Sequence, residues 1–388
     1  MSNSTPPEAI GRLVAARPLE ELADALHVHK TAAAAGLWGS SVALVTTAIH
    51  KQLKRRVLLI CGHLDESEDL ADDIELFAGF RPDVMPALEL GGSLGRVSEE
   101  QVSNRLQMVS RYATGKAEAP ILVAPIQALM QAVPSRNQLQ QLMLTLKPGL
   151  ALEPEKLIVW LSEHGYNRLD QVEVPGDFAV RGGIIDIYMP GSFEEAGDMV
   201  GLTVRVDFFG DEIESIRKFD LDTLGSGDKL DSVRVMDLKG QLDSGDSTSL
   251  FTYLPPDTVV VLWEPLEIAE QAKSYFDRLP DVKGIYPLKA VLSQAGSFAR
   301  LELSQFDQGT SSAPSLVGAA AGAMKLPITS LQRFETEAKK ALRELGELAE
   351  THEVIVYCEN EGEAKRFCEL LEADVSSDAC KKIKVPIG

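Results

Sequence analysis

Residues 165–188 read GYNRLDQVEVPGDFAVRGGIIDIY, a run of short apolar segments divided by Pro175-Gly176 and Gly182-Gly183. TVRVDFF at residues 203–209 and EIESIRKF at residues 212–219 continue the pattern, with Gly210-Asp211 between them as a tight hairpin turn. We predict strands over Gln171–Val174, Phe178–Val180, Ile184–Tyr188, Thr203–Phe209 and Glu212–Phe219. With a strand over residues 142–146 and a helix over residues 153–163, they indicate a small α+β unit with an antiparallel sheet.

The preceding segment, from about Leu19 to Met130, has a different texture. Buried strands are expected at residues 57–61 and 121–124, and amphipathic helices run through Leu70, Ile74 and Phe77 and over residues 98–112. Ser98 is a candidate cap for the second helix, with Gln101 three residues later. Strands that alternate with helices favour a parallel sheet of the α/β type.

The same texture returns after the α+β unit. Residues 225–249 are rich in Gly, Asp and Ser and are predicted to be mostly loop; a strand over 258–262 and a helix over 266–279 follow. Residues 308–322 are a predicted linker. Beyond it we expect a helix marked by Phe334, Ala338, Leu342 and Leu345, then a strand over 353–358, a helix over 361–371 and a strand starting near 383.

The predicted architecture is therefore α/β, a parallel-sheet domain with an inserted α+β domain. We place the first part of the parallel-sheet domain at residues 1–133, the insertion at 134–220 and the second part at 221–308. A linker at 309–329 leads into the start of a further α/β domain at 330–388, where the chain is expected to stop inside a domain.

One motif nearly matches a phosphate-binding loop. Residues 36–43 read GLWGSSVA just before a predicted helix. A working loop needs Lys to reach the terminal phosphates and Ser or Thr to bind magnesium. Val42 and Ala43 hold those positions, so ATP hydrolysis is not expected here, whether the turn is a plain one or a degenerate phosphate loop. The residues concerned are Gly36, Gly39, Ser40, Ser41, Val42 and Ala43.

The segments at residues 165–188 and 203–217 closely resemble the module shared by the excinuclease protein UvrB and the bacterial transcription-repair coupling factors. Weaker similarity extends over about Leu37–Phe219 and on to Gly388. UvrB keeps a complete phosphate loop and a tyrosine-rich hairpin, and this sequence has neither. Residues 96–108 resemble the direct passage into a helix found in the coupling factors, so the resemblance favours an amino-terminal segment of that family. It implies a degenerate, helicase-like (P-loop-derived) first domain.

In that family the inserted domain is the docking surface for the excinuclease protein UvrA. Arg168 and Arg181 lie near glycines, and the planar guanidinium of each can donate several hydrogen bonds to a carboxylate. Aromatic residues are frequent anchors of protein interfaces. The candidate partner-binding residues are Arg168, Arg181, Phe178, Gly182 and Phe209. The resemblance also implies contacts with RNA polymerase and DNA, and an ATP- and magnesium-dependent DNA-translocating motor, all in regions beyond residue 388. This segment itself is expected to hold no cofactor.

Each candidate also has a structural interpretation. An Arg on a strand is commonly a solvated residue, and a Phe in such a run is commonly part of the core. Asp186 is expected to cap a loop or pair with an Arg. His27 and His29 lack a third metal ligand nearby, and Glu264, which follows a strand where an ATPase places its acidic magnesium ligand, is read as a helix-start charge or a relic.

Composition restricts the remaining alternatives. A formal charge of −20 opposes direct binding to DNA phosphates. Four scattered cysteines predict neither a disulfide framework nor a zinc site. The polar start and the lack of a long apolar run favour a cytoplasmic protein with no membrane partner. Two rival functions stay open: a UvrB-like excinuclease or other P-loop DNA-dependent ATPase or helicase, and direct recognition of damaged DNA.

Overall fold

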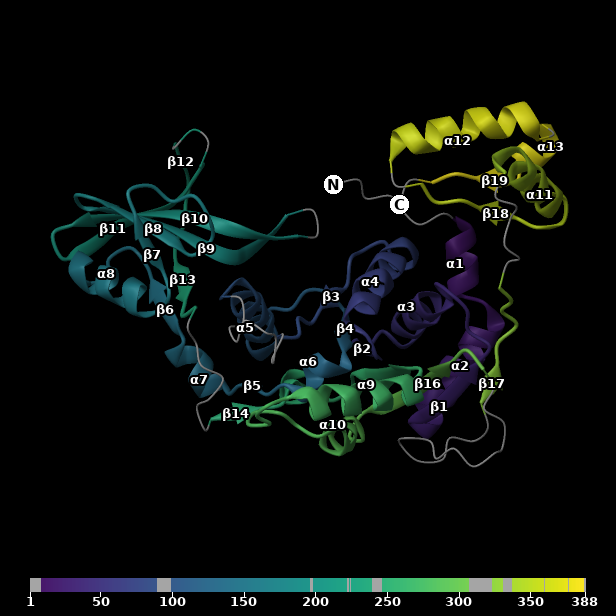
Figure 1. Cartoon of the computed structure of the whole chain (residues 1–388), viewed down its shortest axis with the longest axis horizontal. Helices are drawn as coiled ribbons and strands as arrows, with labels where there is room; N and C mark the ends of the chain where they lie inside the picture. Colours follow the sequence, from purple (N-terminus) through teal and green to yellow (C-terminus); the bar gives the residue numbers. More distant parts are fainter. Residues whose placement is uncertain are drawn as a thin grey trace.

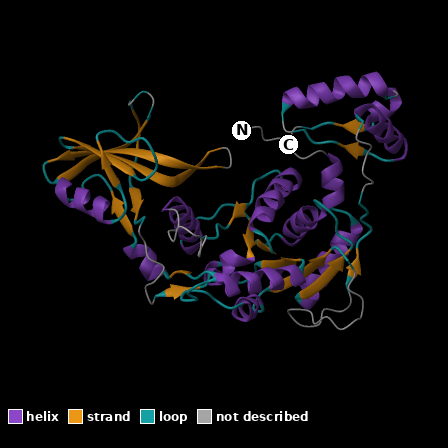
Figure 2. Cartoon of the chain, viewed as in Figure 1, coloured by secondary structure: helices purple, strands orange, loops and turns teal. Residues whose placement is uncertain are grey.

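The computed structural model describes residues 8–88, 99–195, 198–221, 223, 225–238, 246–306, 323–330, 337–358, 360–375 and 377–386. The chain forms a large parallel sheet flanked by helices, a second sheet at one end of the molecule, and a small third unit near the C-terminus (Figure 1). Figure 2 shows the helix-rich body beside the mostly β inserted unit. The predicted Ser98 cap and Phe334, together with the whole predicted 308–322 linker, lie outside the described residues.

The body is built on a seven-stranded sheet in which every neighbouring pair is parallel. This confirms the α/β class. In sheet order its strands are β17 (Met324–Lys325), β1 (Thr31–Ala35), β16 (Ala299–Ser304), β15 (Val259–Trp263), β2 (Val57–Cys61), β4 (Ile121–Pro125) and β3 (Asp83–Val84).

Both faces of this sheet are covered, which is why its central strands are continuously apolar. In β2, Leu58 and Ile60 enter one core, while Val57, Leu59 and Cys61 enter the other. The first core is closed by helices α5 (Glu99–Ala113), α6 (Ile126–Met130), α9 (Pro265–Arg278), α10 (Leu288–Ala295) and η1 (Leu250–Tyr253). The second is closed by α1 (Glu8–Val14), α2 (Arg17–His29), α3 (Ser41–Leu53) and α4 (Leu64–Ala78).

Strands β1 and β16 lie inside this sheet, although the sequence pattern did not predict them. β1 is TAAAA and carries no large apolar residue. Its register against β16 pairs Ala32 with Leu301 and Ala34 with Leu303. Small side chains are suited here because helix α2 contacts the strand closely, so tertiary packing overrides the weak intrinsic preference of Ala for strands.

The inserted unit holds a six-stranded sheet with α8 (Pro154–Glu163) on one face. The strand order is β12 (Ser226–Lys229), β11 (Glu212–Phe219), β10 (Asp198–Phe209), β9 (Ile184–Glu195), β8 (Asp177–Arg181) and β7 (Asn167–Leu169). All pairs are antiparallel except β7 with β8. The predicted strand at Gln171–Val174 is wrong: the Glu173 and Val174 amides donate to the Asp177 carboxylate in a loop, and the strand lies earlier, at β7.

The inserted unit also extends beyond the predicted boundary at Asp220. Strand β13 (Val233–Met236) pairs with β6 (Met143–Leu146), and Val233, Val235 and Leu238 pack into the core below the sheet. In its described part, the expected loop at residues 225–249 contains strands β12, β13 and β14 (Ser247–Thr248). β14 pairs with β5 (Val133–Pro134), and α7 (Arg136–Gln141) follows β5, so two chain passages join the insertion to the body.

The third unit contains α11 (Ala338–Thr351), α12 (Glu361–Asp374) and α13 (Ser377–Cys380) around a small core. Its two short strands, β18 (Val354–Ile355) and β19 (Ile383–Lys384), pair in parallel. The predicted strand over 353–358 is thus much shorter than expected. Arg12 of α1 donates to Glu353, and Ile355 packs against the second core of the body. The third unit is therefore fixed to the body by an ion pair to α1 and by apolar contact.

Candidate functional site: the distal end of the inserted unit

Two hairpin turns meet at the end of the inserted sheet that lies farthest from the parallel sheet (Figure 1). Gly182-Gly183 joins β8 to β9, and Gly210-Asp211 joins β10 to β11. The first glycine of each turn has a positive φ, +62° at Gly182 and +60° at Gly210, which a two-residue hairpin loop favours. The Phe208 amide donates to the Gly183 carbonyl at 2.8 Å, so the two turns are held side by side.

A third segment completes this end of the unit. Residues 149–152 run beside the start of β11: the Leu152 amide donates to the Asp211 carbonyl at 2.8 Å, and the Gly149 amide donates to the Ile213 carbonyl at 2.8 Å. We call residues 149–152, 168–170, 181–184 and 209–212 together the distal end. Its backbone is anchored by interstrand hydrogen bonds and presents a fixed surface.

Phe209 is the most exposed large apolar side chain of the described residues, at 80% exposure. It stands at the last position of β10, with Gly210 after it, and open space surrounds both Gly182 and Gly210. A side chain of this size normally contributes to a core, so its exposure at a rigid turn is a candidate protein-contact feature. The backbone at Gly182 is likewise exposed.

Arg168 and Arg181 are both exposed at the β7 side of the distal end. Arg181 donates to the Asp170 carbonyl oxygen at 3.3 Å. Neither guanidinium has a carboxylate of the described residues within ion-pair distance, unlike Arg81, Arg111 and Arg205. Two exposed guanidinium groups without a carboxylate partner among the described residues thus lie in a chain whose formal charge is −20.

The two arginines emerge on opposite faces of the sheet. Arg168 is in register with Phe178, whose side chain enters the core under α8. Arg181 lies three residues after Phe178 and therefore points to the other face, because side chains alternate along a strand. A partner that contacts both must reach around the β7 edge.

Phe178 is not a docking residue. Its side chain is completely buried among Leu157, Leu161 and Ile187 in the core between the sheet and α8. The prediction that it contacts a partner is wrong because position 178 of β8 faces the helix-covered side. Asp186 has the expected structural role: it accepts two hydrogen bonds from Arg205, at 2.7 and 2.9 Å.

The phosphate-loop-like turn leads from β1 into α3, so the helix expected after it is present, whereas the strand before it was not predicted. Gly36 and Gly39 have positive φ values between β1 and α3. The Ser41 hydroxyl accepts a hydrogen bond from the Trp38 amide at 2.8 Å, whereas Ser40 is exposed and makes no side-chain cap. Val42 and Ala43 are buried in the second core of the body, where they present neither a cation nor a metal-binding oxygen.

The surroundings of this turn also disfavour the binding of an anion. The Leu326 carbonyl oxygen lies 3.3 Å from where a Cβ on Gly36 would stand, so its partial negative charge faces the turn. Glu264, with a positive φ of 51°, accepts a hydrogen bond from the Gln305 amide at 2.6 Å. Burial, together with Glu66 and Glu267, raises the pKa of Glu264, and its backbone contact fits a structural role.

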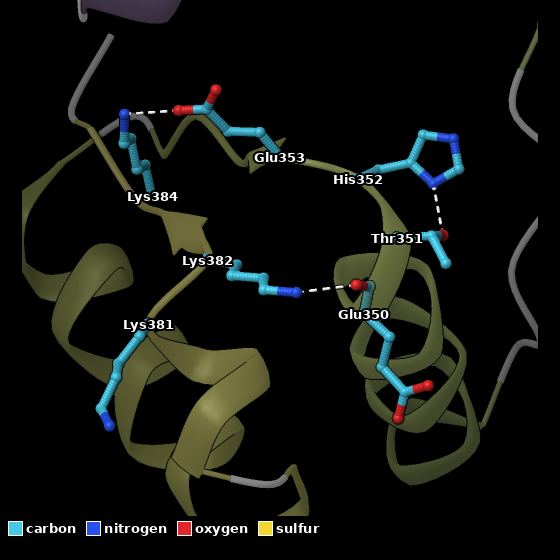
Figure 3. A pocket seen from close by; sticks show the side chains of 7 residues that line it. All are labelled: Glu350, Thr351, His352, Glu353, Lys381, Lys382 and Lys384. Carbon is cyan, nitrogen blue, oxygen red and sulfur yellow. Dashed lines mark hydrogen bonds and ion pairs between the residues drawn. The ribbon is translucent and has the colours of Figure 1, made fainter.

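An open pocket that the sequence pattern did not single out lies in the third unit (Figure 3). It is lined by residues of α11, of β19 and of the connections that lead into β18 and β19: Glu350, Thr351, His352, Glu353, Lys381, Lys382 and Lys384. Its lysines are engaged within the chain: Lys384 pairs with Glu353, Lys382 donates to the Glu350 carbonyl at 2.7 Å, and Lys381 pairs with Asp378. The pocket therefore offers no lysine without a partner.

Metal and disulfide chemistry have no support in the part of the chain that the structure describes. No cluster of three or more His, Cys, Asp or Glu side chains is arranged to hold a metal ion there, and His27 contacts Arg55 instead. Cys61, Cys358, Cys368 and Cys380 are all free thiols. None of the described helices combines the length and the apolar character that crossing a bilayer requires.

Comparison with known proteins defines the class. Residues 144–239 match the family model of the UvrB interaction domain, which spans the inserted unit as the packing delimits it, β6 to Leu238. The inserted unit that the α/β body carries is therefore similar to the UvrB interaction domain.

Relatives of this chain include transcription-repair-coupling factors. That of Bacillus subtilis is 34% identical over 203 residues, which cover 52% of this chain and 16% of the relative. That of Haemophilus influenzae is 29% identical over 206 residues, covering 47% and 17%. That of Staphylococcus aureus RF122 is 26% identical over 329 residues, covering 82% and 25%. The chain thus aligns with a quarter or less of these relatives and is similar to their amino-terminal segment, which confirms the resemblance seen in residues 165–188.

Proposed function

We propose that this chain is the recruiting module of a transcription-repair-coupling factor, which brings the excinuclease protein UvrA to stalled transcription complexes in the cytoplasm. The match of residues 144–239 to the UvrB interaction domain carries the proposal. By analogy with the relatives, contacts with RNA polymerase and DNA, and ATP-driven translocation, would belong to regions that this chain does not contain.

The distal end is the proposed contact surface. Protein interfaces concentrate their binding energy in a few aromatic and Arg side chains surrounded by weaker contacts. Arg168, Arg181 and Phe209 supply these types around the exposed glycine turn at Gly182. The two guanidiniums favour a partner surface rich in carboxylates, and their charge would steer its approach.

The body would serve as a scaffold without catalysis. Three features disfavour binding of a nucleotide–magnesium complex. Val42 and Ala43 are buried, the Leu326 carbonyl lies beside Gly36, and the Glu264 carboxylate is hydrogen-bonded within the chain. The rigid parallel sheet would hold the inserted unit through the β5–β14 ribbon, where the Ser135 amide donates to the Asp246 carbonyl at 3.0 Å.

Calorimetric titration of the whole chain with purified UvrA tests the proposal. The double variant Arg168→Glu/Arg181→Glu should bind at least about tenfold more weakly, because reversed charges repel carboxylates. Arg234→Glu is the matched control, since Arg234 is exposed on β13 of the same unit but away from the distal end, and it should bind like the wild type. No binding by the wild-type chain would refute the function; equal binding by the double variant would refute the site.

A further inference from the structure

The β7 edge of the inserted sheet has the features of a docking site for an extended peptide. β7 is the last strand of the six-stranded sheet and contains only Asn167, Arg168 and Leu169, all of them exposed. An edge strand leaves half of its backbone donors and acceptors available for another chain. Natural sheets often protect such edges with charged side chains or a covering segment.

The hydrogen-bond pattern identifies which residue faces outward. The Asn167 amide donates to the Gly176 carbonyl at 2.9 Å, towards β8. Since successive amides of a strand point to opposite sides, the N–H and C=O of Arg168 point away from β8. Neither group has a hydrogen-bond partner among the described residues. Arg168 therefore presents a donor and an acceptor of the main chain, spaced as in a β-ladder.

The side chains around this edge indicate what kind of segment fits. Leu169 is 43% exposed and Val174, in the loop that follows, is 57% exposed, so apolar surface accompanies the edge. Arg168 leaves the sheet on one face and Arg181 on the other. A strand placed beside β7 also has side chains on both faces, and carboxylates at successive positions, which lie on opposite faces, would reach the two guanidiniums.

We propose that UvrA docks by adding an extended, acidic segment to the β7 edge, with main-chain hydrogen bonds to Arg168 and ion pairs to Arg168 and Arg181. This inference rests on the proposed function and adds the mode of binding to it. An added strand can contact arginines on both faces of the sheet. A partner seated on one face alone would contact only one of them. Main-chain bonds supply affinity in this mode, and side chains supply specificity.

The matched variants Arg168→Pro and Arg168→Ala separate the main chain from the side chain. Both remove the guanidinium, but only Pro removes the outward N–H, and it breaks no described hydrogen bond within the sheet. Pro is tolerated on edge strands for this reason. Titration of the full chain with UvrA should show that Arg168→Pro binds about tenfold more weakly than Arg168→Ala. Equal affinities of the two variants would overturn edge addition.

Amide hydrogen exchange supplies a second readout that does not depend on a variant. In the free chain the Arg168 amide should exchange quickly, and excess UvrA should protect it, whereas the Arg234 amide serves as the control. Binding with no protection at Arg168 refutes edge addition and leaves the proposed function intact. Absence of binding refutes the proposed function itself. Thermal unfolding of Arg168→Pro at the wild-type temperature would show that a loss of affinity is not a loss of folding.

Discussion

Asp186 of β9 and Arg205 of β10 face each other across the inserted sheet and share two hydrogen bonds, of 2.7 and 2.9 Å. Asp186 is buried, and the Arg205 guanidinium also lies 5.2 Å from the centre of the Phe219 ring. The hydrogen bond to the Asp186 carboxylate raises the pKa of Arg205. Because the register between β9 and β10 sets Gly183 beside Phe208, this pair helps to align the two turns of the distal end.

Removing the Asp186 carboxylate should therefore destabilise the chain. We expect Asp186→Asn to lower the free energy of unfolding by about 3 kcal/mol, since a largely buried guanidinium loses its anion. Urea denaturation monitored by circular dichroism measures it. Glu369→Gln, which breaks the exposed Arg366–Glu369 pair, is the control and should cost no more than about 0.5 kcal/mol. Equal losses of unfolding free energy in the two variants would show that the buried pair stabilises the chain no more than an exposed pair does.

The two phenylalanines of the predicted site should behave in opposite ways. Phe178→Ala should reduce the unfolding free energy by about 3–5 kcal/mol, because it opens a cavity in the core under α8. Phe209→Ala should change stability by less than about 0.5 kcal/mol yet weaken partner binding by more than about 1 kcal/mol. Denaturation and titration of the same two proteins check both statements. Full affinity in Phe209→Ala would remove Phe209 from the contact surface.

Placing a lysine in the phosphate-loop-like turn should not create a nucleotide site. Val42 is 1% exposed and packs in the second core, so Val42→Lys should lower stability by about 3 kcal/mol or more. Ser40→Lys adds the same charge at an exposed position of the same turn and should be nearly neutral. Thermal unfolding with and without magnesium–ATP tests both. A Val42→Lys protein of wild-type stability that ATP stabilises further would contradict this account of the turn.

We expect an aspartate of helix α4 to make the unfolding free energy depend on pH. Burial, with Asp69 and Asp72 nearby, raises the pKa of Asp73 from 3.8 to about 6. The folded state then holds this proton more tightly than the unfolded state, so the Asp73 contribution to stability is present below about pH 4 and is lost as the pH rises to about 6. Asp73→Asn should accordingly match the wild type near pH 4 and be about 1 kcal/mol more stable at about pH 7.5, a value reduced for solvent screening.

The measurement is the difference in unfolding free energy between Asp73→Asn and the wild type across this pH range. Asp257→Asn removes one negative charge from an exposed loop and controls for the general effect of net charge. A difference between Asp73→Asn and the wild type that stays constant over the whole range would show that Asp73 is not the responsible group.

Local patterns predicted much of the inserted unit correctly. Alternating apolar residues located β8, β9, β10 and β11, and Gly210-Asp211 was correctly placed as the hairpin turn. The strand expected at Gln171–Val174 failed because the Asp177 carboxylate ties those amides into a loop. The end of the unit was missed because β12 and β13 are short, and their partners β11 and β6 lie elsewhere in the chain.

The sequence by itself determined the α/β class, the presence of an inserted β-rich unit, the absence of a lysine from the phosphate-loop-like turn and the resemblance to the coupling factors. These depend on residue type and on spacing along the chain. Only the tertiary structure decided that Phe178 is core, that Arg168 and Arg181 lie on opposite faces, and that an alanine strand lies inside the parallel sheet. A strand's alternation tells which residues share a face, but the elements packed against it determine which face is buried and which strand forms the edge.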